Sequence, residues 1–329
     1  MVDVAWQSED VVQDVAERAR VLQKLKASDA LFRILTRSAA IFVLLMLSGV
    51  IISLVSGSLP ALYEFGFGFV SAQIWNPVTE KFGALAPIYG TLVTSLIAML
   101  IAVPFGLLIA MFLTELCPKW LRRPIGIAIE LLAGIPSIIY GIWGLFVLAP
   151  FFAEHVQPAL IAATGNVPVL STLFAGPPYG IGILTASFIL AIMVLPFVTS
   201  ISRDVFDAVP PVLKEAAYGL GCSTWEVMRF VVLPHTRVGV IGGVMLGLGR
   251  ALGETMAVTF VIGNAHKINA SLLAPGTTIA ATIANEFTEA VGDLYTSSLI
   301  ALGLLLFVIT FIVLALARFL LMRIEGKVG

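Results

Sequence analysis

Hydrophobic residues in this chain gather into long runs separated by short polar segments, and they do not alternate with polar residues as membrane β-strands would require. Six runs are each long enough to cross a hydrocarbon core of about 30 Å as a helix. Inside lipid, backbone groups must bond within their own segment, so such runs are helices. We therefore expect an all-α polytopic membrane protein with spans at Ser38–Leu59, Leu85–Leu113, Pro124–Pro150, Tyr179–Ile201, Val238–Asn264 and Thr296–Ala317.

Composition agrees with lipid as the main solvent. Of the 329 residues, 59% are hydrophobic and only 12% are charged, about half the charged fraction of a soluble domain. The first 37 residues are polar, so we expect residues 1–37 to be a cytoplasmic segment and residues 38–329 to be the transmembrane domain. Two interpretations of Val11–Leu25 stay open: a helix lying on the membrane surface, or a solvated arm.

The distribution of positive charge predicts the orientation. Sixteen of the nineteen Lys and Arg residues lie in the N-terminal segment, the second and fourth loops, or the tail. The opposite loops carry only Lys81 and Lys267. Since cytoplasmic loops are enriched in Lys and Arg, we expect both termini to lie in the cytoplasm. The membrane is expected to be a bacterial plasma (inner) membrane.

Neither a cofactor nor a nucleic-acid partner is expected. The net charge of −1 lacks the basic excess typical of nucleic-acid binding. Cys117 and Cys222 fall on the predicted cytoplasmic side, where thiols stay reduced. Neither cysteine, nor any of the three separated histidines, has metal-ligand spacing.

The polar loop before the fifth span, residues 203–237, has the pattern of two short helices joined by a turn. Pro211 suits the first turn of a helix, where its missing N–H is not needed. Gly221 permits a sharp stop, and Ser223–Glu226 has the spacing of a capping box for a second helix. Pro234 is expected to end that helix and direct the chain into the next span. This loop therefore predicts a helical hairpin on the cytoplasmic face.

The same loop resembles the EAA loop of bacterial ABC importer permeases. That pattern is EAA, three residues, G, nine residues, I, one residue, LP, and here only Val231 departs from it, in place of Ile. In that family the loop contacts the ATPase subunit. The resemblance thus implies a coupling element, and an ordinary surface hairpin is the alternative. Its candidate residues are Glu215, Ala216, Ala217, Gly221, Leu233 and Pro234.

The fifth span contains two charged residues, Arg250 and Glu254, at a spacing that would place them on one helix face. Charges inside a span cost at least about 2.5 kcal/mol each and are usually functional. Gly239, Gly243 and Gly247 lie on the same side of the predicted helix as Arg250 and Glu254. Small residues at this spacing predict a close-packing seam with a neighbouring helix. Two interpretations stay open: Arg250 faces the path as a forked donor for an oxyanion, held by Glu254, or the pair is a structural salt bridge.

Two further residues are candidates for the substrate path. Pro104, Pro136 and Pro196 interrupt three spans, and Pro136 is the position where we expect a true break; Ser137 would then begin a half-helix that can face an anion. The alternative is that all three prolines only kink packed helices. Thr91 could also line a path, although Ser and Thr in helices commonly bond their own backbone.

Four further runs resemble the phosphate-specific branch of these permeases, and its PstC subunits more than its PstA subunits. They are residues 87–95, 135–141, 181–184 and 247–258, and the resemblance covers about residues 40–323. It implies uptake of inorganic phosphate. It also implies a sister permease (PstA-like), a cytoplasmic ATPase dimer (PstB-like) and an extracytoplasmic phosphate-binding protein (PstS-like).

The chain itself is expected not to be an enzyme. It has no Gly-x-x-x-x-Gly-Lys-Ser/Thr loop, so ATP and its magnesium are expected on the partner subunit. The alternatives are a permease for another oxyanion, such as molybdate or sulfate, and a secondary transporter or channel without an ATPase. A polytopic membrane enzyme would need a cluster of catalytic side chains, which the sequence does not show.

Overall fold

The computed structural model describes residues 3–325. Within that range the chain forms helices and one isolated antiparallel bridge between Asn76 and Lys81. Six helical stretches there are long and apolar enough to cross a membrane: Ser28–Phe65, Leu85–Leu116, Ser137–Thr164, Ile183–Asp207, Thr224–Gly253 and Asp293–Phe319. The prediction of an all-α chain with six transmembrane helices is therefore confirmed.

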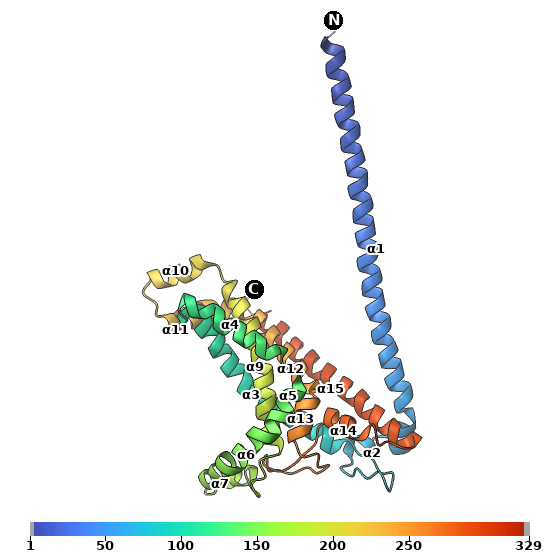
Figure 1. The fold of residues 1–329 in the computed structure, drawn as a ribbon, viewed down its shortest axis with the longest axis vertical. Coiled ribbons are helices and arrows are strands. Elements are labelled where there is room, and N and C mark those ends of the chain that lie inside the picture. The colour runs from blue at the N-terminus through green and yellow to red at the C-terminus, as the bar shows by residue number, and fades with distance from the viewer. Residues whose placement is uncertain (1–2, 326–329) are drawn as a thin grey trace. The chain divides into compact units, whose positions relative to one another are not determined.

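The helices follow one another with few long loops (Figure 1). Their bounds are α1 Asp3–Phe65, α2 Gly68–Ser71, α3 Leu85–Met111, α4 Lys119–Gly134, α5 Ser137–Trp143, α6 Ala149–Phe151, α7 Gln157–Thr164, α8 Pro168–Leu173, α9 Ile183–Asp207, α10 Pro211–Gly219, α11 Thr224–Val227, α12 Leu233–Gly253, α13 Met256–Val261, α14 Ile279–Glu286 and α15 Asp293–Glu325. Within the described chain, π-helical turns occur at Phe112–Leu116, Gly144–Leu148, Phe152–Val156 and Met228–Val232.

Contacts divide the chain after residue 56 into two units. The first unit is the long initial part of α1, which is helical without interruption from Asp3. No change of conformation marks residue 37, the expected end of the N-terminal segment. Residues 1 and 2 and the side chains of most residues before 28 lie outside the described residues, so the role of this segment stays a prediction.

The second unit, residues 57–329, has α9 at its centre. Helices α3, α12 and α4 pack around it. Four side chains on two successive turns of α9 are each 2% exposed or less: Ile189, Leu190, Met193 and Val194. These four positions lie on one face of α9, and apolar residues of the opposite face, such as Leu184, Ile192 and Leu195, are partly buried. Apolar residues on both faces are typical of a helix inside a bundle.

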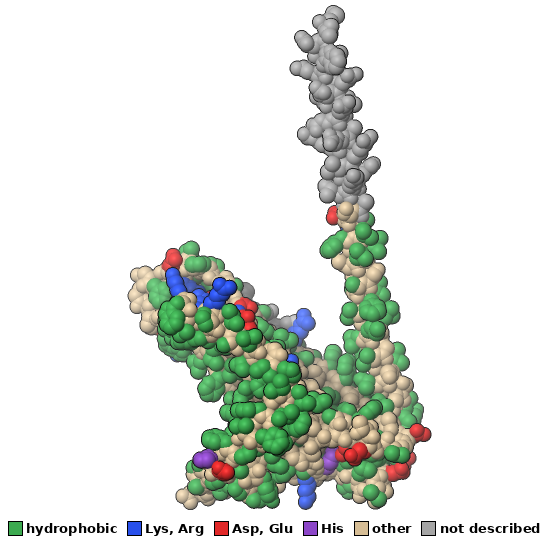
Figure 2. All heavy atoms as spheres, in the orientation of Figure 1, with side chains coloured by type: hydrophobic (Ala, Val, Ile, Leu, Met, Phe, Trp, Pro, Cys, Tyr) green, Lys and Arg blue, Asp and Glu red, His purple; other side chains and the backbone are tan. Residues whose placement is uncertain are grey.

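The two ends of this unit differ in charge. Helices α10 and α11 lie at one end, and α2, α7 and α14 lie at the other (Figure 1). Lys and Arg side chains gather beside α4 and α10, whereas hydrophobic side chains cover the surface between the ends (Figure 2). This separation is the spatial counterpart of the charge distribution in the sequence.

The third predicted span, Pro124–Pro150, is corrected by the structure. The helix breaks at Ile135 and Pro136, whose ψ angles are 129° and 137°. Proline disfavours the helical region for the residue before it, so Ile135 becomes extended and α4 ends at Gly134. The span begins at Ser137, as the expected break at Pro136 implies, and α4 is a separate helix.

Four segments meet at the carboxylate of Glu286, at the end of the unit opposite α10. Trp75 and Tyr295 donate hydrogen bonds to its Oε2, the latter at 2.7 Å. The His266 Nε2 lies 2.9 Å from its Oε1. The Trp75 and His266 rings stack with centroids 5.3 Å apart. This cluster ties the loop before α3, the segment after α13, α14 and α15 to one another.

Candidate functional site

The predicted coupling loop forms the expected helical hairpin. Helix α10 begins at Pro211 after an extended Pro210. Glu215 and Ala216 point to solvent, and Ala217 is the residue of α10 that is buried. It packs on a small apolar cluster with Ala110, Phe206, Val209, Val227, Met228, Val232 and Val240. The helix thus rests on the molecule along a narrow strip and leaves most of its surface open.

A polar contact also fixes α10. The Lys214 Nζ lies 2.6 Å from the Glu115 Oε1 and donates to the Phe206 carbonyl at 3.3 Å. The two side chains are only 16% and 11% exposed. Removing one partner from a pair this buried costs about 3–5 kcal/mol. Glu115 therefore holds α10 against the end of the second span.

Gly221 supplies the turn between α10 and α11. Its φ is +86°, in the region that L side chains rarely adopt. Two residues later the expected capping box is formed. The Ser223 N–H donates to the Glu226 Oε2 at 2.8 Å, and the Glu226 N–H donates to the Ser223 Oγ at 3.4 Å. The hairpin is thus fixed by local chemistry.

The open face of the hairpin carries large apolar side chains that the sequence analysis did not single out. Val212, Leu220, Trp225 and Phe230 are 58–86% exposed. A neighbouring hollow of about 290 Å³ lies between the end of the second span and α11, and Trp225, Met228 and Leu116 are among its lining residues. The aromatic residues in this otherwise polar loop were the feature of the sequence that could have indicated an exposed apolar surface. Such a surface is suited to receiving part of another protein.

Pro234 does not end a helix, which corrects the prediction for this residue. Thr224–Gly253 is one helical stretch, and Leu233 and Pro234 lie inside it. The turn before them is widened to a π-helix, in which the Leu233 N–H bonds to the Met228 carbonyl. Local π-helical adjustment accommodates a proline that cannot donate. Helix α11 and the fifth span are consequently one continuous rod.

The expected pairing of Arg250 and Glu254 on one helix is also wrong. Helix α12 ends at Gly253, and Glu254 is extended, with ψ 129°. Glycine lowers helix stability, and the chain leaves the helix directly after it. The two side chains form no ion pair. The predicted fifth span, Val238–Asn264, is therefore replaced by α12 and a separate short helix, α13.

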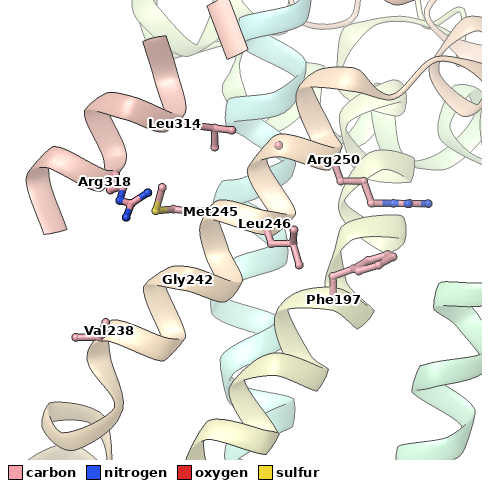
Figure 3. A pocket seen from close by; sticks show the side chains of 9 residues that line it. Phe197, Val238, Gly242, Met245, Leu246, Arg250, Leu314 and Arg318 are labelled. Carbon is pink, nitrogen blue, oxygen red and sulfur yellow. The ribbon is translucent and has the colours of Figure 1, made fainter. Parts of the chain in front are cut away.

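Arg250 instead stacks on an aromatic ring of α9. Its guanidinium carbon lies 4.5 Å from the centroid of Phe197. Figure 3 shows both side chains at one edge of a groove, with Arg318 of α15 on the other wall. The groove has a volume of about 790 Å³ and is otherwise mainly apolar. A guanidinium over an aromatic face is held in orientation and keeps its forked donors available.

Glu254 lies at the break, two residues before the start of α13. It is 9% exposed, and its Oε1 accepts a weak hydrogen bond of 3.4 Å from the Ala257 N–H. Helix α13 packs against α5. A Cβ at Gly141 of α5 would lie 3.1 Å from the Ala257 Cα. Ser137, at the start of α5, is partly exposed. The two helix breaks of the chain are thus joined through α5 and α13.

The structure places Thr91 at a helix contact and not on an open surface. Its side chain is 2% exposed. The hydroxyl donates to the Pro87 carbonyl at 2.8 Å and accepts from the Ile279 N–H at 2.9 Å. Thr91 therefore anchors the start of α14 to α3.

The glycine seam of α12 lies against α9. An added Cβ would lie 2.7 Å from Val205 at Gly239, 2.9 Å from Ile201 at Gly243 and 2.9 Å from Val194 at Gly247. Glycine at these positions lets the backbone approach the neighbouring side chains. The rod that carries the hairpin is in this way packed closely on the central helix.

Within the described residues, no group of three or more His, Cys, Asp or Glu side chains could hold a metal ion. The described site offers an exposed apolar hairpin and a cationic side chain, Arg250, in the last turn of α12.

Sequence comparisons identify many relatives. Residues 102–326 match the family "Binding-protein-dependent transport system inner membrane component". The "Phosphate transport system permease protein PstC" of Mesorhizobium japonicum is 68% identical over 95% of this chain and 96% of that protein. The protein of the same name from Pasteurella multocida is 60% identical, over 92% and 94%. "Phosphate transport system permease protein PstC 1" of Mycobacterium tuberculosis is 42% identical, over 79% and 78%.

A solved structure shares the fold. It is titled "Crystal structure of bacterial alginate ABC transporter in complex with alginate pentasaccharide-bound periplasmic protein". It is 19% identical, with a TM-score of 0.60, and the match covers 90% of this chain and 95% of the matched chain. The family match and the PstC relatives show that the chain belongs to the binding-protein-dependent transport system inner membrane components, in the branch of the PstC phosphate permeases.

Proposed function

We propose that this chain is the membrane-spanning permease subunit of an ATP-driven importer that moves inorganic phosphate across the bacterial plasma membrane. The observation that carries the proposal is the 68% identity to a phosphate permease over 95% of the chain. The exposed hairpin of α10 and α11 agrees with it, because a protein that transmits work needs a rigid surface for its partner. Helix-in-groove docking is one recurring form of contact between proteins.

The proposed partners follow from the same family. They are a sister permease, a cytoplasmic ATPase dimer that binds ATP and magnesium, and an extracytoplasmic phosphate-binding protein. The permease would perform no hydrolysis itself. Its termini and hairpin would face the cytoplasm, where the positive charges gather, and the cluster around Glu286 would face outward.

In this mechanism the ATPase displaces the hairpin, and the continuous rod from Thr224 to Gly253 carries the displacement to the helix break at Glu254. Arg250 would bind an oxygen of the phosphate through its forked donors. Glu254 and Ser137 would lie beside the path at the two breaks. Repulsion between Glu254 and the bound anion would favour its release into the cytoplasm.

Association with the ATPase tests the coupling hairpin. We expect Gly221→Val to reduce co-purification of the ATPase subunit at least about tenfold, since a β-branched residue at φ +86° must shift the turn. Gly219→Val is the matched control, because Gly219 has open space around it and no positive φ. Equal retention of the ATPase by both variants would remove the assigned role of the turn. A wild-type chain that imports phosphate without any ATPase would overturn the proposed function.

Phosphate uptake by reconstituted vesicles tests Arg250. We expect Arg250→Ala to lower the initial uptake rate at least about 100-fold and Arg250→Lys to be intermediate, because Lys cannot provide a planar fork. Arg318→Ala, on the other wall of the same groove, should change uptake less than about threefold. If Arg250→Ala assembles with its partners and transports normally, Arg250 is structural only. Preference for molybdate or sulfate over phosphate in the same vesicles would favour the alternative oxyanion importer.

A further inference from the structure

Three ion pairs join the segment that contains the end of the second span and α4 to the segment that contains the end of α9 and α10. The Glu115–Lys214 pair is 2.6 Å long. Arg122 pairs with Asp207. The Glu130 Oε1 lies 2.8 Å from the Arg203 Nη2. We call these three pairs the ion-pair ladder.

The order of the ladder is antiparallel, and its polarity alternates. Residues 115, 122 and 130 meet residues 214, 207 and 203, and the first segment contributes an acid, a base and an acid in turn. A shift by one rung in either direction would bring like charges together, which costs free energy. The ladder therefore favours this relative position of α4 and the start of α10.

Arg203 contacts acids on two helices. It bonds Glu130 on α4 and also Asp204 at 3.1 Å, and its side chain is 21% exposed. Gly126 lies between Arg122 and Glu130 on the same face of α4. A Cβ there would approach the Arg203 Nη1 to 2.8 Å, so the absence of a side chain lets the guanidinium lie against α4. A charged side chain packed in this way moves with the helix that it contacts.

The ladder connects the hairpin to the helix breaks by a route separate from the fifth span. Asp207 ends α9 and lies four residues before Pro211, the start of α10. On the other side, α4 leads through the break at Pro136 into α5. Helix α5 touches α13 through Gly141, which lies against Ala257, and the Ala257 N–H bonds to Glu254. A displacement of α10 that is carried by the ladder would thus reach the opposite side of the proposed phosphate path.

We propose that Glu130 and Arg203 are positioning residues for transport: the ion-pair ladder makes α4 and α5 follow the ATP-driven movement of α10. This inference rests on the proposed function. On this inference, two structures couple ATP hydrolysis to the phosphate path: the α12 rod and the ladder. Both must move together for each phosphate that passes.

The test uses the complete transporter in proteoliposomes and measures phosphate transported and ATP hydrolysed in the same sample. Glu130→Arg and Arg203→Glu should each raise the ATP used per phosphate at least about fivefold. The double variant restores the pair with reversed polarity and should return the ratio to within about twofold of wild type. Recovery in such a double variant is the signature of direct interaction between two side chains.

Arg123→Glu is the matched control. Arg123 is a neighbour on α4 that lines the same hollow as Arg203, yet it forms none of the described ion pairs. It should leave the ratio unchanged. If the single reversals keep the wild-type ratio, or the double variant is no better than either, the ladder has no coupling role.

Failure of the proposed function would look different, because the wild-type transporter would then show no phosphate-dependent ATP hydrolysis. Subunit stoichiometry, measured on each purified variant, separates lost assembly from lost coupling. A variant that fails to assemble is replaced by Glu130→Gln, which removes the pair without introducing a repulsive charge and should still raise the ratio.

Discussion

Glu286 illustrates how a single buried charge is stabilised in this protein. Burial raises the pKa of this carboxyl, but the hydrogen bonds from His266, Tyr295 and Trp75 lower it by more, and its net pKa lies below the ordinary value. The side chain is 18% exposed, so these bonds replace most of the water that an ionised carboxylate needs. Its charged form is therefore the form that the fold stabilises.

Acid should weaken this contribution. A folded-state pKa below the unfolded one gives stabilisation that is complete above about pH 4.3 and is lost as the pH falls through the folded-state value. We expect Glu286→Gln to destabilise the protein by about 1–2 kcal/mol at pH 7, as lost hydrogen bonds to a charged group do, and to reduce the loss of stability between pH 5 and pH 3.

Thermal unfolding of detergent-solubilised protein across this pH range provides the measurement. Glu289→Gln is the control, because Glu289 is an exposed acid three residues further along the chain. Acid sensitivity that is the same in the wild type and Glu286→Gln would show that the cluster does not depend on the ionised carboxylate.

At the scale of elements, the sequence predicted what depends on neighbours along the chain. The hairpin was predictable because Pro211, Gly221 and the Ser223–Glu226 box each act within a few residues. Pro234 was mispredicted by the same local rule, because that rule does not foresee the π-helical turn at Met228–Val232 that precedes the proline. The hydrophobic pattern is uniform along a membrane span, so it did not reveal that α12 ends at Gly253.

Contacts between elements were beyond the reach of the sequence. The stacking of Arg250 on Phe197 and the pairing of Glu130 with Arg203 join residues that are 53 and 73 positions apart. No periodicity or motif relates such positions. The glycine spacing in α12 did indicate a close contact, but it could not identify α9 as the neighbouring helix. The sequence could therefore identify the residues of the candidate site, but it could not predict how they are arranged in space.

At the scale of the whole molecule, the two native cysteines offer a test of orientation. Cys117 precedes α4 and Cys222 follows the Gly221 turn, and both are free and partly exposed. Lys267 is exposed in the segment after α13. Since positive charge predicts that the hairpin faces the cytoplasm, a membrane-impermeant maleimide should label Lys267→Cys in spheroplasts and leave the native cysteines unlabelled.

Inside-out vesicles stripped of peripheral proteins should give the reverse pattern, with labelling at Cys117 and Cys222. Labelling of the native cysteines in intact spheroplasts would place the hairpin outside the cell. That outcome is incompatible with coupling to a cytoplasmic ATPase, whatever the sequence identity to known permeases.

The glycine contact between α9 and α12 has a consequence for the amplitude of movement. Helix α12 has 21 residues and spans about 32 Å at 1.5 Å per residue. Along that length Val205, Ile201 and Val194 occupy the space where its side chains would otherwise be, and dense packing of this kind is nearly incompressible. We therefore expect the two helices to tilt as one rigid unit, so that a displacement at one end of the bilayer reaches the other end without being absorbed between them.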